Sequence, residues 1–272
     1  MPELPEVETV KNSLKELILN DKIINIDIYY DKIIKNVTPE EFKNSLINQT
    51  FIDIKRLGKY LIFVLDDYYL ISHLRMEGKY YLGETSEINK HEHIIFFFKD
   101  KNLRYQDTRK FGTMYIYKKD VDIYKENPLN KVGYEPFDKR VTPAYLYSKM
   151  GKSIRPIKSS LLDQQIMSGL GNIYVDEVLF MAKINPLTPS KSLSIKDYEE
   201  IIKSSITVLN KAIALGGTTI RSFTVNHEIS GRFQNELLIH TKTECPECHM
   251  QIKKVFVGGR GTYHCIKCQP MR

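Results

Sequence analysis

The sequence predicts an α+β multidomain protein, with an N-terminal helix and a β-sandwich followed by a helical domain and a four-cysteine zinc finger. Three observations carry this prediction. Short β-like runs repeat over residues 22–118, helical patterns replace them from Pro143 onward, and all four cysteines lie after residue 244. At 272 residues, the chain is long enough for one large domain or two ordinary ones.

The first element is a helix that begins near Pro5, since proline and acidic residues are favourable in a first helical turn. The same residues allow a second interpretation. Removal of Met1 would leave Pro2 with a secondary amine, which titrates at about 7.7–8 and is partly neutral near pH 7. Glu3 and Glu6 would then lie close enough for proton transfer. The spacing alone leaves both interpretations open.

The strands of the predicted sandwich are short, rich in β-branched and aromatic residues, and separated by turn signals. Together with the first helix they define an expected N-terminal domain over residues 1–118. The expected strands are Ile23–Tyr30, Phe51–Arg56, Tyr60–Leu65, Tyr68–His73, Ile94–Phe98, Leu103–Gln106 and Thr113–Tyr117.

A linker over residues 119–142, which contains prolines and a glycine, is expected to separate this domain from a helical domain over residues 143–240. Within the helical domain, residues 217–236 form a polar, glycine-containing loop without periodicity, and such loops are usually functional or mobile. The expected helices are Pro143–Lys152, Lys158–Met167, Asn172–Ala182 and Ile195–Leu215.

Local signals support two of these helix ends. Ser194 and Asp197 have the spacing of a capping pair at the start of the last helix, and Gly216-Gly217 would end it. The glycine turn at residues 168–172 joins two helices, and the helix that follows it could hold a phosphate at its N-terminus. Taken alone, this turn is also typical of ordinary helical hairpins.

The four cysteines predict a metal site in an expected zinc-finger domain over residues 241–272. They are spaced C-x2-C-x16-C-x2-C, and two such pairs complete a tetrahedral shell of four thiolates. Such a shell leaves no position for water, so we expect one structural zinc ion and no organic cofactor. The ligands are Cys245, Cys248, Cys265 and Cys268.

Composition and charge favour a polyanionic partner. The chain carries a net charge of +7 and is 42% hydrophobic, which is typical of a soluble globular protein. Its basic excess is concentrated between Thr241 and Arg272. No apolar run approaches the roughly 20 residues that span a bilayer, and the first residues lack the pattern of a secretory signal. We therefore expect an intracellular protein without a membrane partner.

Several short motifs are distributed along the chain. They are M-P-E-L-P-E-V-E-T at 1–9, L-G-K-Y-L at 57–61, H-L-R-M-E-G at 73–78, K-H-E-H at 90–93, D-T-R-K-F-G at 107–112, G-L-G-N-I-Y-V-D-E at 169–177 and G-G-T-T at 216–219. Together with the finger, they resemble the formamidopyrimidine-DNA glycosylase (Fpg) family of bacterial repair enzymes. The resemblance covers essentially the whole chain. It implies a helix-two-turn-helix fold for the helical domain.

The resemblance implies a bifunctional DNA glycosylase and apurinic/apyrimidinic lyase that removes 8-oxoguanine and formamidopyrimidines from damaged duplex DNA. Pro2 would attack C1′ of the damaged nucleoside to leave a Schiff base, and Glu3 would donate or relay a proton. β-Elimination and then δ-elimination would follow. Glu6 would orient the site, and Lys59 would supply a cation near the phosphate and sugar. Arg260 would contact flanking phosphates and is commonly assigned a proton-donor role in δ-elimination.

Such an enzyme must extrude the damaged nucleotide, at a cost of roughly a few kcal/mol, and must fill the gap. Met76, Arg109 and Phe111 match the family's filler residues. Phe111 would be an apolar wedge, and Arg109 would pair with the orphaned cytosine. Without the resemblance, Met76 and Phe111 are typical of ordinary strand residues.

The resemblance also implies phosphate contacts at Asn172 and Lys158 and places His91 near DNA. Glu77 and the 217–236 loop would help to read the everted base. His91 and His93 form an H-x-H pattern, but two histidines without a third partner favour an ordinary strand over a metal site. We expect a monomer that acts on DNA in the bacterial cytoplasm.

Two departures and two alternatives accompany this interpretation. Family members often carry Tyr-Gly-Arg before the first cysteine, where this chain has His240-Thr241-Lys242, and Ser153 replaces a basic residue of some relatives. The nearest alternative is an endonuclease VIII-like enzyme for oxidised pyrimidines, which shares the fold and the terminal proline. The other is a non-catalytic zinc-finger DNA-binding protein.

Overall fold

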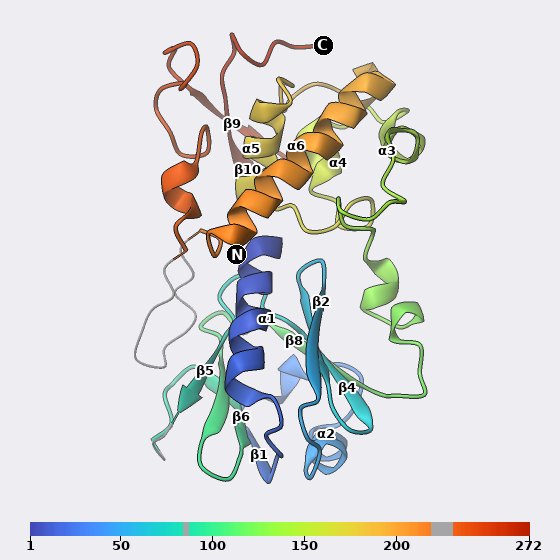
Figure 1. Cartoon of the computed structure of the whole chain (residues 1–272), viewed down its shortest axis with the longest axis vertical. Helices are drawn as coiled ribbons and strands as arrows, with labels where there is room; N and C mark the ends of the chain where they lie inside the picture. Colours follow the sequence, from blue (N-terminus) through green and yellow to red (C-terminus); the bar gives the residue numbers. More distant parts are fainter. Residues whose placement is uncertain (84–86, 219–230) are drawn as a thin grey trace. The chain divides into compact units, whose positions relative to one another are not determined.

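The computed structural model of the chain describes residues 1–83, 87–218 and 231–272 (Figure 1). Its backbone contacts divide it into two compact units. The first unit comprises Met1–Asn130 and Gly216–Gly231, and the second comprises Lys131–Leu215 and Arg232–Arg272. The segment that begins at Gly216 therefore groups with the N-terminal unit, although it follows the last helix of the second.

The first unit contains two four-stranded antiparallel sheets, in the orders β1-β6-β7-β5 and β2-β3-β4-β8. Two α-helices accompany the sheets within the described residues of this unit. The elements are α1 (Leu4–Ile18), β1 (Asn25–Ile28), α2 (Pro39–Leu46), β2 (Asp53–Leu57), β3 (Tyr60–Val64), β4 (Tyr68–His73), β5 (Lys79–Gly83), β6 (Glu92–Phe97), β7 (Asn102–Gln106) and β8 (Thr113–Lys118).

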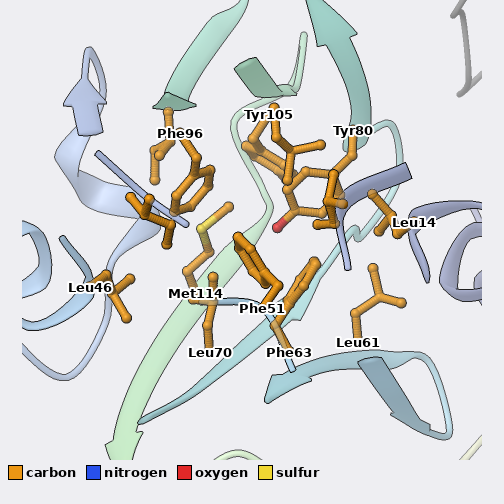
Figure 2. Packing of buried hydrophobic residues seen from close by; sticks show 14 of the residues in the cluster. Leu14, Leu46, Phe51, Leu61, Phe63, Leu70, Tyr80, Phe96, Tyr105 and Met114 are labelled. Atoms are coloured by element: carbon orange, nitrogen blue, oxygen red, sulfur yellow. The ribbon is translucent and has the colours of Figure 1, made fainter. Parts of the chain in front are cut away.

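One hydrophobic cluster joins both sheets to both helices, which makes the two sheets a sandwich (Figure 2). Phe63 enters the cluster from the second sheet, and Phe96 and Tyr105 enter it from the first. Helix α1 adds a stripe of fully buried residues at helical spacing, including Val10 and Leu14. Burial of each such side chain contributes about 1.5–3 kcal/mol. The predicted sandwich and N-terminal helix are confirmed.

Two elements of the first unit were not predicted. Helix α2 has only eight residues, yet its start carries a capping box in which Thr38 and Glu41 bond each other's backbone. This signal was available in the sequence. Strand β5 follows the Glu77-Gly78 turn directly and pairs with β7, from Lys79 opposite Gln106 to Gly83 opposite Asn102. Its K-Y-Y-L-G sequence places three apolar residues in a row and so shows no alternating pattern.

The second unit is helical, with a β-hairpin near its end. Its elements are α3 (Pro143–Met150), α4 (Ile157–Leu161), α5 (Asn172–Met181), α6 (Ile195–Ala214), β9 (Lys253–Val257) and β10 (Arg260–His264). Helix α6 contacts α3 and α5, and α5 contacts β10 (Figure 1). Ser194 and Asp197 form the expected capping box of α6. Gly216 and Gly217 follow α6 with φ of 75° and 77°, as expected for a glycine stop.

One predicted helix is shorter than expected. Helix α4 ends at Leu161, whereas the sequence predicted a helix over Lys158–Met167. Gln164 accounts for the difference, because its Nε2 donates to the carbonyls of Leu162 (3.0 Å) and Leu170 (2.9 Å). These side-chain bonds turn the chain and compete with the helical ladder.

No helix within the described ranges is both long and apolar enough to cross a membrane.

Candidate active site and nucleic-acid interface

The first turn of α1 holds two buried glutamates. Glu3 is the N-cap residue and Glu6 lies one turn further, with exposed fractions of 2% and 4%. The Oε2 atom of Glu6 accepts the Glu3 N–H at 2.8 Å. Its Oε1 atom accepts both the N–H (2.8 Å) and the hydroxyl (3.1 Å) of Thr218. One carboxylate therefore joins the start of the chain to the segment that begins at Gly216.

Gly217 allows this approach. A Cβ atom at this position would lie 2.6 Å from Oε1 of Glu6, and the φ of 77° also favours glycine. Pro2 is half-buried just before the glutamates, and Met1 is exposed. With Met1 attached, the Pro2 nitrogen is an amide, so a reactive amine at this place requires the removal of Met1.

The hairpin between β2 and β3 carries Lys59 next to Gly58, whose φ of 56° suits the tight turn. Arg56 braces the hairpin, because its side chain donates to the Gly58 carbonyl (2.9 Å) and to Glu8 of α1 (2.8 Å). Lys59 itself is only 5% exposed. The helix that carries the glutamates is thus tied to the hairpin that carries the lysine.

His73 lies at the end of β4, just before the turn that carries Met76. Its Nδ1 accepts the N–H of Arg75 at 2.9 Å, and Arg75 has a φ of 54°. Burial, together with the positive charges of Arg75 and Lys59, lowers the pKa of His73 to about 3. The ring is therefore neutral, and its lone pair stabilises the strained turn.

This lowered pKa predicts an acid-sensitive stability. The folded state binds no proton at His73 until the pH approaches about 3, whereas the unfolded chain binds one below about 6.5. As the pH decreases from 6.5 to 5, the free energy of unfolding should therefore decrease by about 2 kcal/mol. Denaturant titrations should show a flatter pH dependence for His73→Asn, which keeps an acceptor without titrating. An unchanged slope for His73→Asn would contradict the assignment.

The three expected filler residues lie on two turns of the first unit. Met76 is 38% exposed and Phe111 is 52% exposed, which is unusual for large apolar side chains. The guanidinium of Arg109 lies 4.7 Å from the centre of the Phe111 ring. Thr108 donates a hydrogen bond to Glu77, so the two turns are in contact. The structure therefore places the three filler residues, and Glu77 with them, on neighbouring turns.

His91 and His93 do not form a metal site with a third residue in the described parts of the chain. His93 is buried, and its Nε2 bonds the Asp107 carbonyl at 2.7 Å. His91 is partly exposed, and its carbonyl accepts the Asp107 N–H at 3.0 Å. The strand interpretation of this H-x-H pattern fits these contacts. Of the expected 217–236 loop, residues 219–230 lie outside the described residues.

Lys158 departs from the expectation of a surface phosphate contact. Its side chain is completely buried, and Nζ lies 2.8 Å from Asp176 Oδ1 and 3.3 Å from the Gly261 carbonyl. A buried ammonium requires such partners, because an unpaired charge would be costly. Asn172 donates to the same Gly261 carbonyl at 3.0 Å. Lys158 therefore holds the β9–β10 hairpin instead of facing solvent.

Asp176 and Glu177 are two site residues that the sequence reasoning missed, although both belong to the G-L-G-N-I-Y-V-D-E motif. Asp176 Oδ2 bonds His240 Nδ1 (2.8 Å) and accepts the Tyr263 N–H (3.2 Å). Glu177 accepts the N–H groups of residues 238–240 at 2.8–3.0 Å. Burial raises the pKa of Glu177, and these three donors oppose that shift. His240, which departs from the Tyr-Gly-Arg segment of many family members, is thus held by a hydrogen bond to α5.

The β9–β10 hairpin carries Arg260 at an exposed position just after its turn. The turn consists of Gly258 and Gly259, both with positive φ, which is the requirement of a type I′ hairpin. A Cβ atom on Gly258 would lie 3.2 Å from the hydroxyl of Ser159 in α4. The hairpin tip therefore packs beside α4. Arg260 precedes Gly261, whose carbonyl accepts the hydrogen bond from Asn172.

The four cysteines converge as the spacing predicted. The sulfur atoms of Cys245, Cys248, Cys265 and Cys268 all lie within 4.8 Å of one another. The Cys248–Cys265 and Cys245–Cys268 separations are 3.4 and 3.8 Å. These exceed the roughly 2.05 Å of a disulfide and approach the roughly 3.8 Å edge of a tetrahedron with 2.3 Å metal–sulfur bonds. The donor set fits a thiophilic metal ion.

Two family models match the chain. The model described as the formamidopyrimidine-DNA glycosylase N-terminal domain matches residues 1–114. The model described as the formamidopyrimidine-DNA glycosylase H2TH domain matches residues 132–224.

Relatives match along nearly their whole length. The chain is 44% identical over 274 residues to a formamidopyrimidine-DNA glycosylase of Exiguobacterium sp., covering 99% of both chains. It is 43% identical over 275 residues to that of Mycoplasma genitalium, covering 99% of this chain and 96% of the relative.

Solved structures show the same fold. A Lactococcus lactis Fpg variant in complex with Fapy-dG-containing DNA aligns with a TM-score of 0.92 at 42% identity, over 99% of this chain and 100% of that one. The complex of Lactococcus lactis Fpg with DNA that contains an abasic site aligns with a TM-score of 0.91 at 42% identity and the same coverage. The expected fold class is confirmed.

Proposed function

The chain belongs to the formamidopyrimidine-DNA glycosylase family, and from this premise we propose that it excises oxidised purines from duplex DNA in base-excision repair. It is an enzyme of the glycosylase and lyase class to which its relatives belong. One observation carries the assignment of its chemistry. Pro2, which becomes terminal once Met1 is removed, lies directly before the buried Glu3, and the buried Glu6 one turn further bonds Glu3 and Thr218.

In the proposed reaction, Pro2 is the nucleophile after Met1 has been removed. The nitrogen lone pair forms a bond to C1′ of the damaged nucleoside, and the bond from C1′ to the base breaks. The attacking nitrogen gives up its N–H proton, and the base leaves with the bonding electron pair and takes up a proton. The sugar ring then opens at O4′, giving an iminium between Pro2 and C1′.

The iminium explains why a nitrogen nucleophile is needed. It acidifies the C2′ hydrogen, whose loss expels the 3′ phosphate in β-elimination. A second elimination then expels the 5′ phosphate and leaves a one-nucleotide gap. An ester to an oxygen nucleophile would not activate C2′ in this way.

Glu3 is proposed to donate the proton that O4′ requires. Its position beside Pro2 and its nearly complete burial support this role. Glu6 is proposed to position the site, since its two oxygens already bond three donors from Glu3 and Thr218. Lys59 is proposed as the active-site cation, supported by the hairpin that Arg56 ties to α1.

DNA binding is proposed to use exposed and partly exposed groups of both units. Arg260 and Asn172 would contact phosphates, and His91 would lie near the backbone. Lys158 is not included, because its ammonium is buried against Asp176. Met76, Arg109 and Phe111 would fill the gap that the extruded nucleotide leaves, supported by the exposure of the two apolar side chains. Glu77 would help to read the extruded base.

We propose zinc for the four-cysteine site, because four thiolates at this spacing suit it. The ion would hold the β9–β10 hairpin and take no part in the chemistry. We propose four regions along the chain. Residues 1–118 form the catalytic domain, 119–142 the linker, 143–240 the DNA-binding helical domain and 241–272 the zinc finger. A location in the bacterial cytoplasm fits the bacterial origin of the relatives, and we propose that the enzyme is a monomer.

A competition assay tests the substrate class. The protein is mixed with equal amounts of two duplexes, one with 8-oxoguanine opposite cytosine and one with thymine glycol opposite adenine, and borohydride traps the covalent complexes. We expect preferential trapping on 8-oxoguanine. Preference for thymine glycol would favour the endonuclease VIII-like alternative, and no trapping on either duplex would favour a non-catalytic DNA-binding protein.

A further inference from the structure

We propose that Asp107, together with Tyr105, is a positioning residue that holds Arg109 and Phe111 in their DNA-inserting conformation before DNA is bound. This inference rests on the proposed function, in which these two side chains fill the gap left by the extruded nucleotide. Both side chains are completely buried, so they act through the residues of the turn.

The Asp107 carboxylate organises the turn at residues 107–112. It is completely buried, and its two oxygens accept three backbone N–H groups from that turn. Oδ1 accepts from Arg109 at 3.0 Å, and Oδ2 accepts from Phe111 at 2.9 Å and from Gly112 at 2.8 Å. Hydrogen bonds to an ionised acceptor are stronger than neutral ones, so these three fix the backbone of both filler residues.

The conformation that these bonds hold is not an intrinsically favoured one. Lys110, between the two filler residues, has a φ of 57°, in the left-handed region that a residue with a side chain rarely adopts. Without the carboxylate, the turn would lose the partners of three N–H groups and relax towards other conformations. The exposed side chains of Arg109 and Phe111 would then point in varying directions.

The Tyr105 hydroxyl extends this control to the second turn. It lies 3.5 Å from Asp107 Oδ2. A Cβ atom on Gly112 would lie 1.7 Å from this hydroxyl, and one on Gly78 would lie 2.4 Å from it. Both glycines therefore let their turns close onto the same buried oxygen, and Gly78 ends the turn that carries Met76. The Tyr105 ring is fixed in the core against Tyr80, with the ring centres 5.1 Å apart (Figure 2).

The two turns thus behave as one preformed wedge. Ordering a loop only when DNA binds would cost conformational entropy at that step, and a preformed wedge avoids this cost. The step that should depend on Asp107 is therefore extrusion from duplex DNA. Attack on an abasic sugar in single-stranded DNA, which needs no gap filling, should not depend on it.

The test compares these two substrates with Asp107→Asn. Asparagine has the shape of aspartate but carries an N–H₂ group where an acceptor is needed. We expect single-turnover excision of 8-oxoguanine opposite cytosine to fall by about ten-fold to a hundred-fold. Borohydride trapping on a single-stranded abasic site should stay within about two-fold of wild type, because the chemical step is intact. The exposed control Asp120→Asn should behave as wild type on both substrates.

Two further variants distinguish positioning from general destabilisation. Tyr105→Phe removes only the hydroxyl and should show the same selective loss with a smaller magnitude, so it carries the test if Asp107→Asn does not fold. In an Arg109→Ala/Phe111→Ala background, Asp107→Asn should cause little additional loss, because the residues through which it acts are absent.

The outcomes are separable from those of the proposed function. Equal losses on both substrates, or a full additional loss in the background without Arg109 and Phe111, would overturn the positioning role. Excision of 8-oxoguanine at the wild-type rate by a folded Asp107→Asn variant would overturn it as well. Failure of the wild-type protein to trap any abasic DNA would instead reject the proposed function.

Discussion

A chain whose Pro2 nitrogen is blocked by a retained Met1 or an N-terminal extension should form no borohydride-trapped complex with lesion-containing DNA. The blocked nitrogen is an amide, whose lone pair is delocalised and cannot attack C1′. Glycosylase turnover should fall by at least about a thousand-fold, as expected when the nucleophile of a covalent mechanism is lost. Trapping on an abasic duplex and excision on an 8-oxoguanine duplex measure the two effects.

The matched control is the same polypeptide after a protease has removed the extension and exposed Pro2. Trapping should return, while the affinity for uncleavable abasic-analogue DNA should be similar before and after removal. Pro2→Gly provides a second variant, in which a flexible primary amine replaces the rigid secondary one and trapping should be reduced. Full trapping by the blocked chain would show that another nitrogen is the nucleophile.

Removal of the metal is expected to abolish DNA binding while the first unit remains folded. A small hydrophobic core joins the finger to the helical region before it, since Cys245, Ile252 and Cys265 of the finger pack with Phe180 of α5 and with Ile239. Metal binding to such sites contributes about 10–16 kcal/mol, which is far more than this core can supply. Without the ion, the β9–β10 hairpin and Arg260 should lose their fixed position.

The core of the first unit has no residue in common with the finger core, so its folding should not depend on the metal. Fluorescence anisotropy with an abasic-analogue duplex should show a Kd at least about a hundred-fold higher after chelation. Added zinc should restore binding to the wild-type chain but not to Cys248→Ser. Tight binding by a fully metal-free chain would contradict the assigned role of the finger.

Most of the fold could be predicted from the sequence because its elements carry local signals. Alternating strands, the α6 capping box and the cysteine spacing all act over a few residues. Strand β5 was missed because only its pairing with β7 makes it a strand. Helix α4 was predicted too long because the bonds of Gln164 to Leu162 and Leu170 depend on the folded chain.

The site was predicted less completely, since the sequence shows which residues are present but not which are buried. Lys158 illustrates this limit. The family resemblance implied a phosphate contact at this lysine, yet its ammonium is enclosed by Asp176 and the Gly261 carbonyl. Asp107 and His73 belong to motifs that were recognised, but their roles follow from backbone N–H groups that only the folded turns bring to them.

Identification of the trapped residue tests the central proposal most directly. The wild-type protein is reacted with 8-oxoguanine DNA in the presence of borohydride, digested with a protease and a nuclease, and analysed by tandem mass spectrometry. We predict that the sugar-derived mass is attached to the nitrogen of Pro2, in a peptide that lacks Met1. Attachment to Lys59 or to another lysine would contradict the account.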